Sequence, residues 1–364
     1  MAVLSGGSKN SPNIIFRMQF DERSAHAPVS ESDLVEIIRR RVDAGGTKHD
    51  GEVGVGDDAA VMRFEAGHIV LTADAMVDGV HFLSQSMSWH DMGWKCIVSN
   101  QSDIAAMGAI PEHAVLTLAI PAATRVGDLD ELLSGVIGAL DEFGGKLVGG
   151  DTVASDNIIL SVAMTGRLVD AARSLTRDAA SLGQMVAVTG PLGASAGGLQ
   201  VLEETRSQSD GSVFAPSVNR LLGAHFRPAP RIDLVTALVE SGAECAMDVS
   251  DGLLIDLERI CAASGVDAVI YSDRVPVDSD LLSEFPDLAL GLALTGGEDY
   301  ELVYVGDAEM IAQVNEAQPV GVASDFGVVG EIIPRKNGKG EVTVLDAYGE
   351  PIEFEAKGWD HFAR

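Results

Sequence analysis

The chain carries Gly54-Val55-Gly56-Asp57-Asp58-Ala59-Ala60-Val61 and, shortly after it, Leu71-Thr72-Ala73-Asp74-Ala75-Met76-Val77-Asp78-Gly79-Val80-His81-Phe82. Aspartates follow a glycine turn in the first stretch and end an apolar strand in the second. The arrangement returns in Asn100-Gln101-Ser102-Asp103, Gly149-Gly150-Asp151-Thr152 and Asp248-Val249-Ser250-Asp251-Gly252. Aspartates that repeatedly mark the edges of strands and helices indicate a metal site.

Apolar runs and helical spacings alternate around these stretches. We expect strands over 68–74, 113–121, 146–152, 158–166, 184–190 and 266–271, and helices over 34–43, 89–108, 128–143 and 253–263. The alternation predicts an α/β fold of two domains, at 30–170 and 171–364, after a loosely ordered extension over 1–29. The polar stretch 203–212 is typical of an exposed insertion.

The predicted helix 89–108 carries polar side chains among small and apolar ones. Asp103 lies eight residues after Lys95 and four after Ser99, so the three fall near one stripe of the helix. A buried charge without a partner is costly. We therefore expect Asp103 to have a partner in the fold.

The composition restricts the class of ligand. The 364 residues include 55 acidic and 25 basic ones, a net charge of −30, which argues against nucleic acid or an anionic membrane as partner. A phosphorylated substrate would then be held through divalent cations. No apolar run approaches the roughly 20 residues that span a bilayer. The three cysteines, Cys96, Cys245 and Cys261, indicate reduced core residues in a cytoplasmic protein.

Aspartates from separate segments are the candidate Mg²⁺ ligands: Asp58, Asp74, Asp103, Asp151, Asp248 and Asp251. Each one alone is as well explained as a helix cap or turn residue. Thr72 is a further ligand candidate or a structural strand residue. His81 and Glu298, beside glycine turns, are candidates for substrate contact, and each also has a purely structural interpretation.

Several known kinds of site are absent from the sequence. The loop Gly190 to Gly198 lacks the Gly-Lys-Ser/Thr ending of a P-loop, and protein-kinase signatures are missing. No Ser-His-Asp or Cys-His arrangement and no zinc spacing is recognisable. If ATP is the co-substrate, the fold that binds it must be a different one.

Together these motifs resemble the thiamine-monophosphate kinases, of the ATP-binding superfamily that includes aminoimidazole ribonucleotide synthetase, selenophosphate synthetase and HypE. The resemblance covers residues 30 to 362. Two stretches are specific to the kinases within that superfamily, Gly296-Gly297-Glu298-Asp299-Tyr300-Glu301-Leu302 and Lys357-Gly358-Trp359-Asp360-His361-Phe362.

The resemblance implies transfer of the ATP γ-phosphoryl group to thiamine monophosphate, with several Mg²⁺ ions and a homodimer formed through the first domain. It implies metal binding by Asp58, Thr72, Asp74, Asp103, Asp151, Asp248 and Asp251. It further implies ATP binding by Gly150, Asp151, Arg177 and Ser250, and substrate binding by His81, Glu298 and Trp359. No residue is singled out as a phosphorylated intermediate, so direct transfer is expected.

The sequence departs from the resemblance at two points, and three alternative interpretations stay open. Ala73 stands where a hydroxyl residue is common, and the 203–212 insertion has no assigned role. A HypE-like enzyme would use a C-terminal cysteine, whereas this sequence ends in Ala363-Arg364, and a selenophosphate synthetase would carry a reactive residue before Cys96. The non-enzymatic alternative is an acidic metal-binding protein with structural aspartates.

Overall fold

The computed structural model describes residues 41, 68–205, 214–317, 327–336, 338, 340–354 and 357–359. The extension 1–29, most of the expected helix 34–43, the aspartate turn with Asp58 and residues 206–212 of the expected insertion lie outside these residues.

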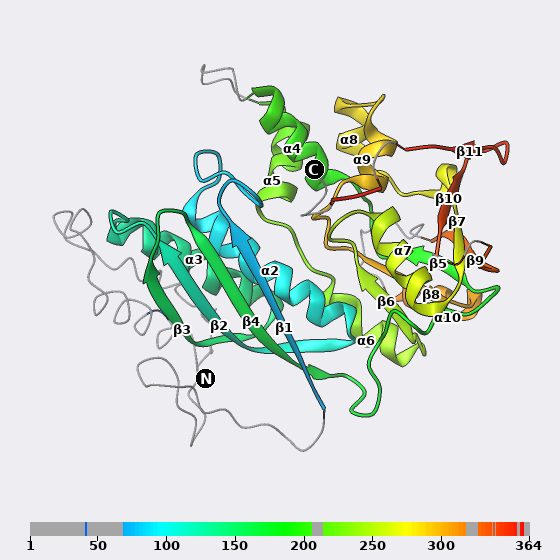
Figure 1. Ribbon diagram of the computed structural model, residues 1–364, viewed down its shortest axis with the longest axis horizontal. Helices are drawn as coiled ribbons and strands as arrows, with labels where there is room; N and C mark the ends of the chain where they lie inside the picture. Colours follow the sequence, from blue (N-terminus) through cyan, green and yellow to red (C-terminus); the bar gives the residue numbers. More distant parts are fainter. Residues whose placement is uncertain are drawn as a thin grey trace, which may run out of the picture.

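The first half of the described chain forms a four-stranded sheet with helices on one face (Figure 1). Its strands, in the order β1-β4-β2-β3, are β1 (Ile69–Val77), β4 (Ile159–Leu168), β2 (Ala109–Ile120) and β3 (Lys146–Ala154). The helices α2 (Trp89–Ala106) and α3 (Val126–Phe143) cover it. Only β2 and β3 pair in parallel, joined through α3.

The second half forms a seven-stranded mixed sheet, in the order β11-β10-β7-β9-β5-β8-β6. The strands are β5 (Met185–Val188), β6 (Cys245–Asp248), β7 (Asp267–Tyr271), β8 (Leu302–Gly306), β9 (Val328–Ile333), β10 (Val342–Leu345) and β11 (Pro351–Ile352). The helices are α4 (Ala194–Thr205), α5 (Pro216–Phe226), α6 (Ile232–Glu240), α7 (Leu253–Ser264), α8 (Ser279–Glu284), α9 (Ala289–Thr295) and α10 (Ala308–Glu316), with a 3₁₀ turn, η1 (Ser272–Arg274).

Helix α2 connects the two halves. It packs on β1, β2 and β4 and also touches α5, α6 and β6 (Figure 1). Its last turn, Ala105 and Ala106, shares a core with Val235 and Leu302, and the indole N–H of Trp94 donates to the Pro228 carbonyl at 2.9 Å. Because elements of both halves pack around α2, polar side chains on this helix such as Lys95 and Ser102 are fully buried.

The structure confirms the α/β fold class and each predicted strand and helix that lies within the described residues, with ends shifted by a few residues. Glu203 to Thr205, the start of the expected insertion, belong to α4 instead. The sequence analysis did not identify α5, α8 to α10 or β9 to β11. The domain boundary at 170 stays a prediction.

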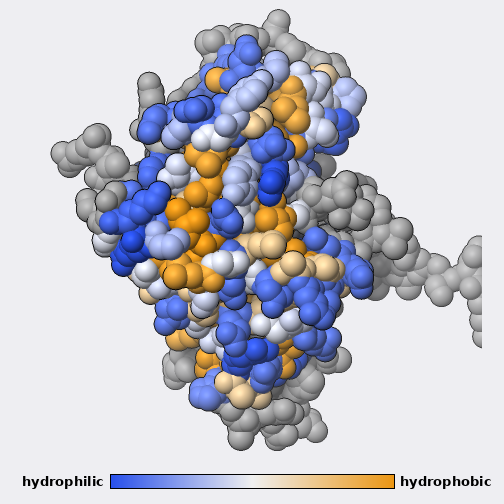
Figure 2. Space-filling view, turned by 90° about the vertical axis from the view of Figure 1, so that its right-hand side faces the viewer, coloured by the Kyte–Doolittle hydropathy of each residue, from blue (hydrophilic) through white to orange (hydrophobic). Residues whose placement is uncertain are grey.

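The surface and core agree with the composition. All three cysteines are buried and free, and no described helix has the length and apolar character needed to cross a membrane. Figure 2 faces the side of the molecule that lies at the right of Figure 1, and it shows a strip of hydrophobic residues among hydrophilic ones. Scattered exposed apolar side chains such as Leu282 and Leu288 are ordinary on globular surfaces, so the polar clusters below are better guides to function.

Candidate active site

A cavity of about 610 Å³ lies between β1, the end of α2 and β6. Its lining includes four predicted site residues from four segments: Thr72, Asp103, Arg177 and Asp248. Asp248 ends β6, and Thr72 lies on the face of β1 that turns toward α2. The fold thus brings together polar groups that are up to 176 positions apart, taking 72 from 248.

Helix α2 exchanges hydrogen bonds with β1 and β6 at this site. The Thr72 hydroxyl donates to Asp103 Oδ2 at 2.5 Å, and the Ser102 hydroxyl donates to Asp248 Oδ2 at 2.9 Å. The Asp74 amide donates to the side-chain oxygen of Asn100 at 3.2 Å. Asp103 therefore has the partner that its place in the helix required.

Three carboxyl groups of the site hold their protons more firmly than usual. Burial raises the pKa of Asp103 to about 7, helped by repulsion from Asp248 and Asp74. Burial, followed by repulsion from Asp256, likewise raises the pKa of Asp248 to about 7. The Arg177 guanidinium opposes both shifts, and the pKa of Asp74 is also raised, mainly by burial. Negative charge is thus concentrated where little solvent screens it.

Among the described residues, no three His, Cys, Asp or Glu side chains are grouped closely enough to enclose a metal ion. Mg²⁺ needs no such group, since it usually takes one or two carboxylates and completes its shell with water and substrate phosphates. Oxygen donors that repel one another suit a hard cation. One or two carboxylates from among Asp74, Asp103 and Asp248 therefore suffice for Mg²⁺ that is bound jointly with a phosphate.

The loop from Asp248 to Gly252 is shaped by a residue that the sequence analysis missed. The Asp256 carboxylate accepts the backbone N–H groups of Ser250, Asp251 and Gly252 at 3.0 to 3.1 Å. Arg259 binds Asp256 at 2.5 Å and Asp251 Oδ2 at 2.6 Å. One oxygen of Asp251 is therefore already neutralised, which weakens its case as a metal ligand.

A second loop, carrying Glu298, runs beside the first. The Glu298 amide donates to the Ser250 carbonyl at 2.8 Å, and the Tyr300 amide donates to Val249 at 3.0 Å. Glu298 and Tyr300 have positive φ angles of 63° and 53°, conformations that L-residues adopt at a cost. Strain of this kind is typical of functional loops that the surrounding fold holds in place.

The described end of the chain reaches the same place. The Trp359 amide donates to the Asp251 carbonyl at 2.9 Å, and Lys357 pairs with Glu258 on α7. The Trp359 side chain remains 52% exposed. The Trp359 ring is thus held at the edge of this loop with about half of its surface exposed.

His81 joins the site from the turn after β1. Its Nδ1 accepts the Val77 amide at 3.0 Å, which leaves Nε2 as the nitrogen that carries the proton when the ring is neutral. Burial raises the pKa of Asp74, and the His81 ring is near enough to oppose part of that rise when it carries a charge. The structure therefore brings His81 and Asp74 together.

Gly150 and Asp151 lie elsewhere in the single chain. Asp74, Val162, Leu116 and Gly150 form one row across the sheet, so Asp151, the next residue, points to the opposite face from Asp74. Three strand spacings separate β3 from β1, roughly 14 Å at ~4.8 Å each. Packing alone explains why residue 150 is a glycine, because a Cβ there would lie 1.9 Å from the Leu116 carbonyl oxygen.

Further polar groups of the site went unassigned in the sequence analysis: Ser102, Asp256, Tyr300, Lys95 and His225. For Lys95 the sequence did contain a pattern that could have pointed to the site, because Lys95 lies four residues before Ser99 and eight before Asp103 on the same helix. Its Nζ donates to Glu298 Oε2 at 2.7 Å, a contact between the two halves of the fold that no local pattern encodes.

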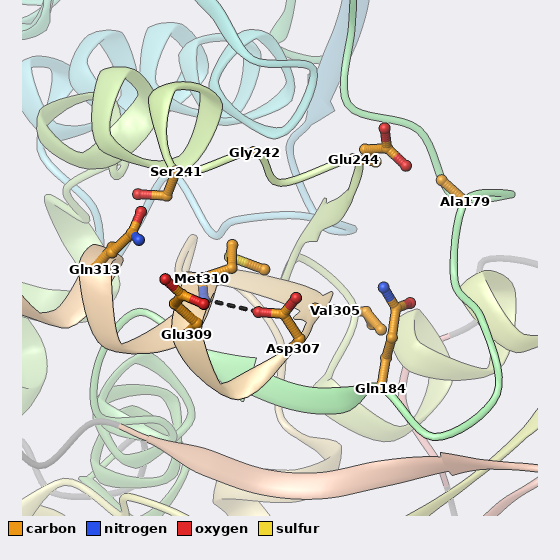
Figure 3. Close-up of a pocket in the computed structure, with 11 residues that line it drawn as sticks. Ala179, Gln184, Ser241, Gly242, Glu244, Val305, Asp307, Glu309, Met310 and Gln313 are labelled. Atoms are coloured by element: carbon orange, nitrogen blue, oxygen red, sulfur yellow. Dashed lines mark hydrogen bonds between the residues drawn. The ribbon is translucent and has the colours of Figure 1, made fainter.

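A smaller cavity of about 190 Å³ lies at the other end of β5, β6 and β8 (Figure 3). Gln184 and Glu244 precede their strands there, and Asp307, which follows β8, accepts the Met310 amide at 2.9 Å as the cap of α10. None of the predicted site residues lines it. The Asp307 carboxylate in this cavity is explained by its role as the cap of α10.

Comparisons with known proteins identify the family of this chain. The family models for the N-terminal and C-terminal domains of AIR synthase related proteins match residues 56–168 and 182–343. The thiamine-monophosphate kinase of Aquifex aeolicus (strain VF5) is 31% identical, with 92% of this chain and 98% of that protein covered.

Two solved structures have the same overall shape. The thiamine-monophosphate kinase from Stenotrophomonas maltophilia K279a superposes with a TM-score of 0.73 at 33% identity, over 85% of this chain and 95% of that one. A structure described as AaThiL complexed with AMPPCP and TMP has a TM-score of 0.70 at 30% identity, over 95% and 100%. With relatives of this identity matched over nearly their whole length, the chain belongs to the thiamine-monophosphate kinase family.

Proposed function

We propose that this protein transfers the γ-phosphoryl group of ATP to thiamine monophosphate, giving thiamine diphosphate and ADP. The observation that carries the proposal is the cavity in which Thr72, Asp103, Arg177 and Asp248 meet. Family membership and the relative bound to AMPPCP, an ATP analogue, and TMP support the choice of reactants.

The acceptor oxygen belongs to a phosphate monoester that is already anionic near neutral pH, so a strong general base is not required. The obstacle is the repulsion between two polyanions. Asp58, Thr72, Asp74, Asp103, Asp151, Asp248 and Asp251 remain the proposed metal-binding set, with Asp74, Asp103 and Asp248 best supported by their shared surroundings. Bound Mg²⁺ would neutralise phosphate charge and align the reactants.

The remaining predicted residues divide between the two substrates. Arg177, on the cavity wall, and Ser250 are proposed to contact the nucleotide. On the acceptor side, His81 would donate a hydrogen bond, Glu298 would complement the thiazolium charge, and Trp359 would stack on a ring. All of these residues lie on loops or strand ends around α2.

We further propose a cytoplasmic homodimer formed through the open face of the four-stranded sheet. That face carries the exposed side chains of Leu71, Val115 and Val153, and exposed apolar residues on an open sheet face suit an interface between copies. Asp151 lies on the same face, so a role for Gly150 and Asp151 in ATP binding requires a second copy there. Light scattering on Val115→Asp, expected to be monomeric, tests the interface.

The assay for the activity uses the purified full chain with ATP, Mg²⁺ and thiamine monophosphate, and measures thiamine diphosphate. Product above the background without enzyme is expected. A folded protein that yields none would reject the kinase and leave the alternatives: another enzyme of the superfamily or a metal-binding protein. ATP hydrolysis without thiamine diphosphate would favour the former.

A further inference from the structure

Lys95 is an unusual residue for the middle of a helix, because its side chain is wholly buried. Its exposed fraction is 0%, whereas that of the Glu298 side chain, its partner at 2.7 Å, is 28%. A buried ammonium needs a hydrogen-bonded counter-charge, and Glu298 supplies it. The difference in exposure means that Glu298 can touch a bound molecule while Lys95 can act only through Glu298.

Glu298 needs to be held in place. It follows Gly296-Gly297 and has a φ of 63°, and the loop is pressed against its neighbour, since a Cβ on Gly297 would lie 2.3 Å from the Ser250 carbonyl oxygen. A glycine-rich segment has many alternative conformations. A contact to a rigid helix selects one of them.

His225 is a second neighbour of the Glu298 carboxylate, and it is uncharged. Its Nδ1 lies 3.4 Å from Glu298 Oε2 and 3.1 Å from the Ser195 hydroxyl. Burial, followed by repulsion from Lys95, lowers the pKa of His225 well below its usual value, so the ring is neutral. The positive charge at Glu298 within this cluster therefore comes from Lys95.

The same helix carries the polar groups at the other end of the site. Asp103 lies eight residues after Lys95, about 12 Å along the axis at 1.5 Å per residue. Asp103 belongs to the cavity proposed for the nucleotide, and Glu298 belongs to the proposed acceptor side. An in-line transfer depends on the spacing between donor and acceptor.

We propose that Lys95 is a positioning residue for the acceptor: it fixes Glu298 relative to Asp103, so that α2 sets the distance between the two ends of the site. The inference rests on the proposed function, because it takes Glu298 as a contact of thiamine monophosphate. Lys95 itself touches no substrate.

The test is steady-state kinetics of the full chain with each substrate varied in turn. Lys95→Met keeps the length and apolar body of the side chain but removes the charge. The KM for thiamine monophosphate should rise about ten- to hundredfold, the range for a charge-assisted hydrogen bond, while the KM for ATP stays within about twofold. In Lys95→Met/Glu298→Gln, the KM should be no higher than in Glu298→Gln alone, because the two residues act as one unit.

Arg231→Met is the matched control. Arg231 is also enclosed, 10% exposed, and its Nη1 binds Glu301, three residues further along the same segment, at 2.9 Å. Two more of its partners, Asp233 and the Thr189 carbonyl, lie outside the proposed site. This variant should lower the Tm and leave the ratio of the two KM values unchanged.

Equal increases in both KM values, a fall in Tm alone as in Arg231→Met, or multiplying effects of Lys95→Met and Glu298→Gln would each overturn the positioning role. If Lys95→Met does not fold, Lys95→Gln, which loses the charge but keeps an N–H donor, must give the same one-sided change in KM. Wild-type protein that forms no thiamine diphosphate would instead reject the proposed function, and this inference with it.

Discussion

Asp103 is hydrogen-bonded and yet has a raised pKa, a combination that is unusual for an aspartate with a purely structural role. Its Thr72 partner satisfies one oxygen, yet burial and nearby carboxylates still raise its pKa to about 7. Such a group destabilises the fold when it is charged. Its presence is therefore better explained by what it binds than by what it stabilises.

Asp103→Asn tests this difference. The amide keeps an oxygen to accept from Thr72, so the Tm should be unchanged or higher, while kcat for thiamine diphosphate formation should fall about hundredfold or more, as when a group that stabilises transition-state charge is removed. Asp141→Asn, an exposed position on α3, should change neither. Full activity in Asp103→Asn would remove the residue from the site.

Among the elements, α2 is under two constraints: it supplies Lys95, Ser102 and Asp103 to the site, and it packs closely on α3. Glycines allow this approach: a Cβ on Gly93 would lie 2.0 Å from the Leu132 carbonyl oxygen, and one on Gly135 would lie 1.9 Å from that of His90. The two backbones touch directly at this crossing. Any added side chain must push the helices apart.

Gly135→Ala should therefore lower the free energy of unfolding by about 1–3 kcal/mol, the usual cost of overpacking, and reduce activity because α2 shifts. Gly138→Ala, on the same helix, meets only the Trp94 ring at 3.4 Å, so it should be neutral or stabilising through the better helix propensity of alanine. Urea unfolding and the kinase assay give both results. Equal stability of the two variants would contradict the close crossing.

At the scale of the whole molecule, the chain has a net charge of −30 and buries carboxyls with raised pKa values. Asp103 and Asp248 titrate near 7, and burial raises the pKa of Asp299 to about 8. All three start from 3.8, so between about pH 4 and 8 these groups bind more protons in the folded protein than in the unfolded chain. Their contribution to the free energy of unfolding must then fall as pH rises across that range.

We expect the metal-free protein to lose stability from pH 6.5 to 8, by about 1 kcal/mol for each of these groups. Mg²⁺ binds the deprotonated carboxylates, so its addition should raise the Tm more at pH 8 than at pH 6.5. Thermal unfolding in EDTA and in Mg²⁺ at both values measures this. Stability that rises with pH in EDTA, or an equal Mg²⁺ effect at both, would show that these carboxyls are not the ones involved.

The sequence by itself determined the alternation of strands and helices, because hydrophobic periodicity and glycine turns are local properties of the chain. It also predicted the candidate aspartates; of these, Asp103 and Asp248 line one cavity and Asp74 acts on Asp103 from beside it, although Asp74 and Asp151 lie inside their strands rather than at the ends. The Lys95, Ser99 and Asp103 spacing was visible for the same reason: a helix has a fixed repeat.

Only the tertiary structure decided which of these groups meet. The pairing of Lys95 with Glu298 depends on contacts between the two halves, and the separation of Asp151 from Asp74 depends on sheet order. The raised pKa values have the same origin, since burial and repulsion are set by neighbours distant in sequence. Local patterns specify which chemical groups are present and on which element, and packing specifies the distances at which those groups act.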